Sequence, residues 1–248
     1  MMRSLLSIGA AFCALGLQSC NNIPAPDSPW DLARGSRATT LAQREVQVRS
    51  HLVNTEDGYT DFEPYVDIQY GALDNLTLSA SLGQGLRRSV YQRDDLRGAT
   101  NNNDPDPFAE EVASVGVNYG FGDNPQSGGP SVQLQSVFTD GSVAEFRPSF
   151  GWHTGSFQVR AGANLADGLD ERLFIEGAYW KHLGDFLGLI ELDAILGDVE
   201  DEDFDEIYLA PGVITQLRKL VQFQVSAPVG LTTESADWQL LIGLVFRL

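Results

Sequence analysis

Three histidines are the side chains of this sequence that titrate closest to neutral pH. They are His51, His153 and His182, and they lie far apart in the chain. A hydrolase acting on membrane lipid would need a serine or another nucleophile held beside such a base. Ser156 is close to His153, but the two flank a predicted turn at Thr154-Gly155, and no serine can be assigned to His51. We therefore expect no enzyme, no catalytic residue and no cofactor. A lipid-modifying outer-membrane hydrolase that uses His51 or His153 is kept as an alternative.

Charged side chains form a second candidate site, because they recur at alternate positions between apolar neighbours. Arg160, for example, lies between Val159 and Ala161. Successive side chains of a strand point to opposite faces, so such charges would share one face and the apolar residues the other. Inside a closed sheet, these charges either set the selectivity of a narrow passage or pair with one another and fill it. The candidates for the inner face are Glu45, Arg49, Glu63, Asp67, Arg147, Arg160, Glu176, Glu191, Asp193 and Arg247.

The alternation that positions these charges predicts an all-β chain. Stretches with a period of two recur from Arg44 onward, with turn residues between them. The clearest is Ala236–Leu248, long enough for a membrane strand of roughly 9–11 residues. One face of that stretch is apolar throughout: Trp238, Leu240, Ile242, Leu244, Phe246 and Leu248. We predict a transmembrane antiparallel up-and-down β-barrel of about twelve strands. A soluble β-sandwich would also alternate and is the alternative fold.

Composition narrows the function classes. The chain of 248 residues carries 34 acidic and 16 basic residues, a formal net charge of -18. Such a surface repels nucleic acid, whose binding depends on Lys and Arg contacts to phosphate. After the N-terminus no apolar run reaches the ~18 residues of a transmembrane helix. A membrane protein without such a helix must be a closed barrel, because lipid offers backbone groups no hydrogen-bond partner.

The N-terminus has the features of an exported bacterial protein. A basic start is followed by the apolar run Leu5–Leu17, which predicts a signal peptide over residues 1–19. The sequence Leu17-Gln18-Ser19-Cys20 resembles a lipoprotein box, in which Cys20 would be lipidated; ordinary cleavage nearby is the alternative. We expect a periplasmic linker over residues 20–43 and the barrel over residues 44–248. The linker either is a flexible tether or packs Trp30 and Leu32 against the barrel mouth. These features predict the outer membrane of a Gram-negative bacterium.

Pairing the strands in order sorts their connections onto two rims. Arg87–Glu110 and Asp198–Glu206 fall on one rim, and Asp74-Asn75 and Arg218-Lys219 on the other. Long loops should be extracellular and short turns periplasmic, so Gly122–Pro130 is long for its place on the short rim. The acidic run at 198–206 could share a divalent cation or meet lipopolysaccharide through bridging cations. A solvated acidic loop is the simpler interpretation, so no metal site is expected.

The closing hairpins carry a resemblance to a known family. Their segments are Leu209-Ala210-Pro211-Gly212-Val213-Ile214, Val221-Gln222-Phe223-Gln224-Val225, Val229-Gly230-Leu231-Thr232 and Leu240–Leu248. In pattern they resemble the end of the outer-membrane family associated with phenol meta-pathway degradation, over about 40 of the 248 residues. The resemblance implies transport of hydrophobic compounds and no catalytic residues. A lipid on Cys20 would depart from that family.

These observations together predict a passive outer-membrane transporter or channel for small molecules, with hydrophobic or aromatic cargo favoured by the resemblance. The expected partners are outer-membrane lipid, lipopolysaccharide and the barrel assembly machinery, together with a small-molecule cargo and no nucleic acid. A plugged barrel with a structural or docking role through Arg87–Glu110 is the second interpretation.

Overall fold

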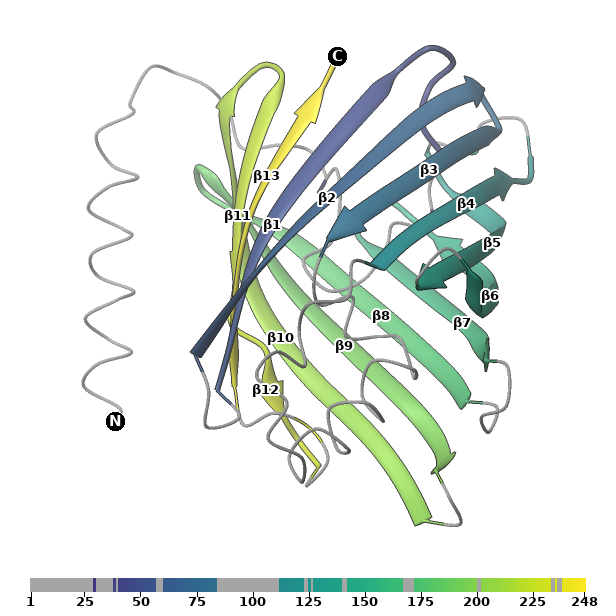
Figure 1. The fold of residues 1–248 in the computed structure, drawn as a ribbon. Coiled ribbons are helices and arrows are strands. Elements are labelled where there is room, and N and C mark those ends of the chain that lie inside the picture. Colours follow the sequence, from purple (N-terminus) through teal and green to yellow (C-terminus); the bar gives the residue numbers. More distant parts are fainter. Residues whose placement is uncertain are drawn as a thin grey trace, which may run out of the picture.

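The computed structural model describes residues 29, 38 and 40–248, apart from 57–59, 84–111, 123–124, 126, 140–141, 167–171, 200–201, 233–234 and 236–237. These residues form one antiparallel sheet that curves into a barrel (Figure 1). In the described part of the chain no helix is long and apolar enough to cross a membrane. The strands are β1 (Val46–Glu56), β2 (Thr60–Leu73), β3 (Leu76–Gly83), β4 (Val112–Gly120), β5 (Gly129–Thr139), β6 (Ser142–His153), β7 (Phe157–Ala166), β8 (Arg172–Leu183), β9 (Phe186–Val199), β10 (Glu202–Arg218), β11 (Val221–Ser226), β12 (Val229–Gly230) and β13 (Gln239–Arg247).

The thirteen segments make twelve barrel strands, because β11 and β12 are two parts of one strand. Both pair with β10 in a single register, in which Gly212 lies opposite Ser226 and Leu209 opposite Val229. The ladder is interrupted at Pro228, which has no N–H to donate. The predicted all-β barrel of about twelve antiparallel strands is therefore confirmed.

The barrel closes between the first and the last strand. β13 pairs with β1 on one side and with β11 on the other. Val46 and Leu248 exchange two backbone hydrogen bonds, with N···O distances of 3.1 and 2.8 Å. Beside them Arg247 Nε lies 3.1 Å from Glu45 Oε1. Closure pairs the first strand with the last, as a spanning sheet in lipid requires.

Most of the large apolar residues of the strands face outward, as the alternation predicts. Large exposed hydrophobic side chains occur on nearly every strand, such as Ile68, Phe150 and Leu192. Aromatic side chains collect on this face near strand ends, where a membrane barrel meets the lipid headgroups. The exposed aromatic residues at or near strand ends include Tyr70, Tyr119, Phe121, Trp152, Tyr179 and Trp238. The outer surface is therefore suited to lipid.

The two rims differ in their connections. The turns 74–75, 154–156, 184–185 and 219–220 lie with the C-terminus on one rim, which we call the short-turn rim (Figure 1). The turn between β4 and β5 is longer, as expected, and its Pro125 is buried against Gly120. The segment Arg87–Glu110, expected as a long loop on the opposite rim, lies outside the described residues.

One expected loop is wrong. The acidic run Asp198–Glu206 is mostly strand, since β9 continues to Val199 and β10 begins at Glu202. The backbones pair through the run, with Asp198 opposite Asp203. β9 and β10 accordingly project beyond their neighbours at the rim opposite the C-terminus (Figure 1). Backbone N–H and C=O groups need hydrogen-bond partners whatever the charge of the side chains beside them. The ladder between β9 and β10 therefore continues past the apolar part of the two strands.

Candidate functional site: the barrel interior

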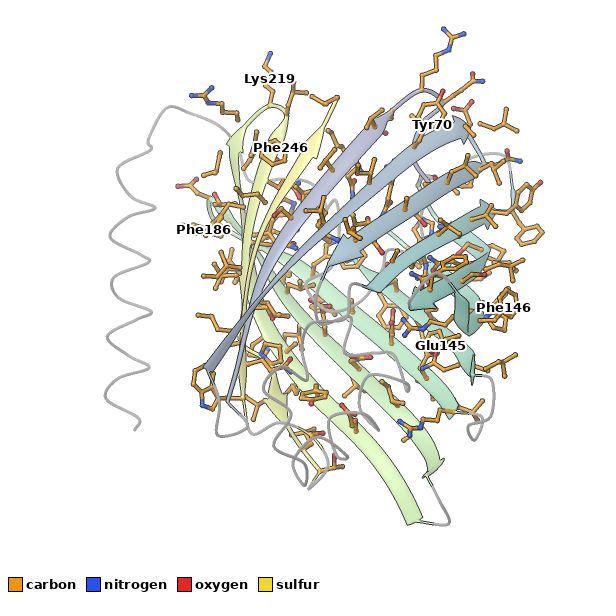
Figure 2. All side chains as sticks on the ribbon, viewed as in Figure 1. Tyr70, Glu145, Phe146, Phe186, Lys219 and Phe246 are labelled. Carbon is orange, nitrogen blue, oxygen red and sulfur yellow. The ribbon has the colours of Figure 1, made fainter. Side chains whose placement is uncertain are left out.

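Most of the predicted inner-face charges lie inside the barrel. Seven of the ten candidates are buried at inward positions of β1, β2 and β6–β9: Arg49, Asp67, Arg147, Arg160, Glu176, Glu191 and Asp193. Figure 2 illustrates the alternation on β6, where Glu145 points inward and its neighbour Phe146 outward. The strand register thus brings residues that are far apart in sequence to one surface.

Two pairs of buried charges combine groups of opposite sign. Arg49 on β1 lies directly opposite Asp67 on β2, with Nη2 and Oδ2 3.8 Å apart. The same Asp67 oxygen accepts a hydrogen bond of 2.8 Å from the amide of Gln69. On β6, Arg147 donates two hydrogen bonds to the carboxylate of Glu145, of 2.7 and 2.9 Å. Two-point pairing of this kind is among the stronger ways to hold a buried charge.

A row of three charges crosses the sheet from β7 to β9. Arg160 lies opposite Glu176, and Glu176 lies opposite Asp193. Residues directly opposite in a sheet have Cβ atoms about 4.5–5.5 Å apart, so the arginine and the first carboxylate can attract while the two carboxylates repel. All three are nearly fully buried. This part of the wall therefore concentrates negative charge toward β9.

The remaining three candidates have other positions. Glu45 and Arg247 form the ion pair at the β1–β13 seam and keep about a quarter of their side-chain surface exposed, 22% and 25%. They lie at the short-turn rim and not deep in the interior. Glu63 belongs to β2, and its side chain lies outside the described part of the structure.

Sequence reasoning missed three buried charges, Glu145, Arg172 and Glu206. Each could have been found from its strand pattern, since Arg172 precedes outward Leu173 and Glu145 is two residues from Arg147. It also missed an apolar cluster on the inner wall of β8–β10 near the short-turn rim. This apolar cluster consists of Ala178, Trp180, Leu187, Leu189 and Ile214. The indole N–H of Trp180 donates to the carbonyl of Gly155 in the neighbouring turn, at 2.9 Å.

The chain before β1 also lies within the barrel. Residue 38 and residues 40–44, which we call the inner segment, contact inward positions of the strands. Ala38 N donates to Gln158 Oε1 at 3.1 Å, and Leu41 N donates to Thr77 Oγ1 at 2.8 Å. The stretch expected as a periplasmic linker therefore ends as a packed part of the wall. Trp30 and Leu32, expected against the barrel mouth, lie outside the described residues, as does Cys20.

The structure places His153 and the nearby Ser156 in different environments. His153 is buried and faces inward at the end of β6, whereas Ser156 is exposed in the turn that follows. His182 is exposed near the end of β8, and the side chain of His51 lies outside the described part. In the residues that are described, no group of three or more His, Cys, Asp or Glu side chains could hold a metal ion.

Comparison with known proteins supports the fold. No protein-family model matches the sequence, and curated proteins give no match. Among solved structures, the KdgM porin is similar at 11% identity and a TM-score of 0.53, over 82% of this chain and 98% of that chain. A complex of the KdgM porin with disordered oligogalacturonate is similar at 10% identity and a TM-score of 0.51, over 82% and 98% of the two chains. An outer membrane channel from Pseudomonas putida F1 has 9% identity and a TM-score of 0.51, over 89% and 99% of the two chains.

These similarities establish a fold shared with outer-membrane barrels, and at such identities they establish the fold alone. The resemblance to the phenol meta-pathway family is not confirmed by any family match.

Proposed function

We propose that the protein is an outer-membrane channel that passes small solutes passively. The observation that carries this proposal is the band of buried charges on the inner wall, from Arg49 to Asp193, which includes the pairs Arg49–Asp67 and Arg147–Glu145. Burying ions away from water is unfavourable even when they are paired, and an apolar interior would hold a barrel together as well or better. Charges that line a water-containing path avoid part of that penalty and can act on passing solutes.

The balance of charges supports a preference for cations. Among the described buried residues, six carboxylates face four guanidinium groups, a net charge of -2. The carboxylates are Asp67, Glu145, Glu176, Glu191, Asp193 and Glu206, and the guanidinium groups are Arg49, Arg147, Arg160 and Arg172. Oligogalacturonate, seen with the KdgM porin, is a polyanion, and this interior would repel such a cargo. We infer small neutral or cationic solutes.

The apolar cluster supports a cargo that has an apolar face. Trp180, Leu187 and Ile214 direct large apolar side chains inward and are at most 2% exposed, so a solute would reach them only where the cluster opens. A small aromatic or aliphatic compound would be suited to this part of the wall. Hydrophobic or aromatic cargo therefore stays part of the proposal.

The plugged barrel is the second candidate, and the degree of burial favours it. Inward side chains such as Gln47, Gln158 and Glu191 are less than 2% exposed. Twelve strands enclose a narrower space than the 16–18 strands of porins with wide aqueous channels. A barrel filled to this extent would serve as a rigid surface structure.

Single-channel recording in a planar bilayer separates the two candidates. We expect discrete conductance steps from the purified protein, with a reversal potential in a KCl gradient that indicates cation preference. Folding is checked by heat-modifiable gel mobility on the same sample. Folded protein that gives neither current nor solute flux into liposomes would overturn the channel proposal in favour of the plugged barrel.

The proposal also covers where the protein lies, how it is oriented and how its N-terminus is processed. The barrel would lie in the outer membrane among lipid and lipopolysaccharide, inserted by the barrel assembly machinery, with its short-turn rim toward the periplasm. Signal peptide removal before Cys20 and lipidation of that cysteine stay predictions. Mass spectrometry of the mature N-terminus tests both.

A further inference from the structure

At the short-turn rim, part of the barrel interior is occupied by the chain's own backbone. We infer that the inner segment sets the size limit of the proposed channel at this rim. The inference rests on the proposed function, because only a barrel that conducts can have a size limit.

The contacts of the inner segment trace a path along half of the wall. Arg44 N donates to the carbonyl of Gly71 on β2, at 2.7 Å, and Leu41 N donates to Thr77 on β3. Ala38 then reaches Gln158 on β7. In six residues the chain thus passes from β2 to a strand five positions further round the barrel, which is within the reach of an extended chain.

Three inward glycines on three strands lie beside the inner segment. A β-carbon placed at Gly71 would lie 1.9 Å from the carbonyl oxygen of Ala42, which is closer than any real contact. A β-carbon at Gly120 would lie 2.5 Å from Pro125 Cβ and 3.3 Å from Thr40 Cγ2, and one at Gly151 would lie 2.9 Å from Ala38 Cβ. The wall therefore lacks a side chain at three positions beside the inner segment. The segment is built into the wall and does not rest loosely at the mouth.

The turn between β2 and β3 fixes the same segment from the rim. Thr40 Oγ1 donates to the carbonyl of Asp74 at 2.9 Å, and Gln43 N donates to the Asp74 carboxylate at 3.0 Å. Ala42 N donates to Glu45 Oε2 at 3.1 Å, and Glu45 is also the partner of Arg247 at the seam. Backbone and side-chain contacts thus hold the segment along its length.

The apolar cluster lies on the other side of the barrel interior at the short-turn rim. Gln158, which binds Ala38, lies directly opposite Ala178 of that cluster in the β7–β8 register. At the short-turn rim the interior is therefore filled by a peptide segment on the β2–β7 side and by buried apolar side chains on the β8–β10 side. Removing the segment should widen the passage without changing the strands.

A disulfide tests the position of the segment. In a background with Cys13 and Cys20 replaced by serine, the β-carbons of Ala38→Cys and Gly151→Cys would start 2.9 Å apart. A shift of roughly 1 Å in the inner segment brings them to the 3.5–4.5 Å that a disulfide needs, so this pair should oxidise. The matched control combines Ala38→Cys with Gly177→Cys, since Gly177 lies at an outward position of β8 with nothing within 4 Å of an added β-carbon. Thiol counting on folded protein should show loss of both thiols in the first variant and none in the control. Equal oxidation of the two variants, or none in either, would overturn the placement on which the inference depends.

Deletion of residues 38–43 tests the size limit. The deleted protein should conduct severalfold more than the full chain and should admit larger sugars in a liposome swelling assay. The double variant Thr40→Gly with Leu41→Gly keeps the backbone length, and it should raise conductance less. It serves as the test if the deletion does not fold. Gly177→Ala is the control that should leave conductance unchanged.

The outcomes separate the inference from the proposed function. Current in the full chain that neither variant changes would overturn the size-limiting role and leave the channel function standing. Current only after deletion or glycine replacement would show that the segment closes the barrel of the full chain, which would overturn the channel proposal for the intact protein and the size limit that rests on it. Absence of current in every folded variant would overturn both the channel function and the size limit.

Discussion

At the short-turn rim the barrel fills its interior in two different ways. On the β8–β10 side, large apolar side chains such as Trp180 and Leu187 point inward and pack together. On the β2–β7 side, the wall has glycines at the matching positions, and the backbone of the inner segment occupies the space. The β8–β10 side depends on large inward side chains, whereas the β2–β7 side depends on glycines that have no side chain. A substitution that removes volume should therefore damage one side, and one that adds volume should damage the other.

The largest effect is expected from Trp180→Ala. Trp180 is 2% exposed and also donates to the Gly155 carbonyl. Removal of a buried tryptophan side chain lowers the free energy of unfolding by about 3–5 kcal/mol, through lost burial and the cavity that remains. Urea titration of the protein in lipid vesicles measures the loss.

The matched control for this change is Trp152→Ala. Trp152 is on the outer face and is half exposed, so lipid replaces its contacts and no cavity forms. The expected loss is clearly smaller than that of Trp180→Ala. Equal losses would mean that the apolar cluster is not a packed part of the interior, and the contrast between the two sides would fail.

Sequence alone predicted the outer face of this comparison much better than the inner one. Lipid demands an apolar residue at every second position, so a strand such as β13 is readable from its pattern. Water, paired charges, apolar side chains and backbone can all occupy the interior, and no single period follows from that mixture. The apolar cluster is an example, because Tyr179 and Trp180 are adjacent and no alternation distinguishes their faces.

The inner segment illustrates a second limit of sequence reasoning. Residues 38–44 have no period, and the proline-containing stretch before them predicts a linker. Their position depends on hydrogen bonds to Thr77 and Gln158, which are distant in sequence. The inward glycines were the feature of the sequence that could have indicated the position of the inner segment. Glycine is unfavourable within a strand unless another part of the chain approaches closely. At Gly71 the Ala42 backbone does so, and at Gly120 and Gly151 side chains of Thr40 and Ala38 are among the close neighbours.

An intermediate effect is expected from Gly71→Ala. The added methyl group would collide with the Ala42 carbonyl, which would displace the inner segment and strain the hydrogen bonds between Gly71 and residues 44 and 45. Overpacking of this kind costs about 1–3 kcal/mol. The change should lower the free energy of unfolding in urea and should increase hydrogen exchange at the Arg44 amide.

Gly177→Ala is the control for added volume. It adds the same methyl group where nothing lies within 4 Å, so stability and exchange at Arg44 should stay as in the unchanged protein. If both alanine variants behave alike, the glycines on the β2–β7 side do not serve to receive the segment.

The smallest effect is expected from Thr77→Val, which removes one hydroxyl and keeps the shape of the side chain. Thr77 is 3% exposed, and its Oγ1 accepts the hydrogen bond from Leu41 N at 2.8 Å. Loss of that acceptor leaves a buried N–H unsatisfied and should cost about 1 kcal/mol. Thr77→Ser retains the hydroxyl and should keep Leu41 protected from hydrogen exchange, whereas Thr77→Val should expose it. Because the strands are unchanged in both variants, faster exchange confined to the inner segment would show that this side is held by individual polar contacts. Faster exchange across β3 and β4 as well would contradict that interpretation, since the segment and the wall would then unfold together.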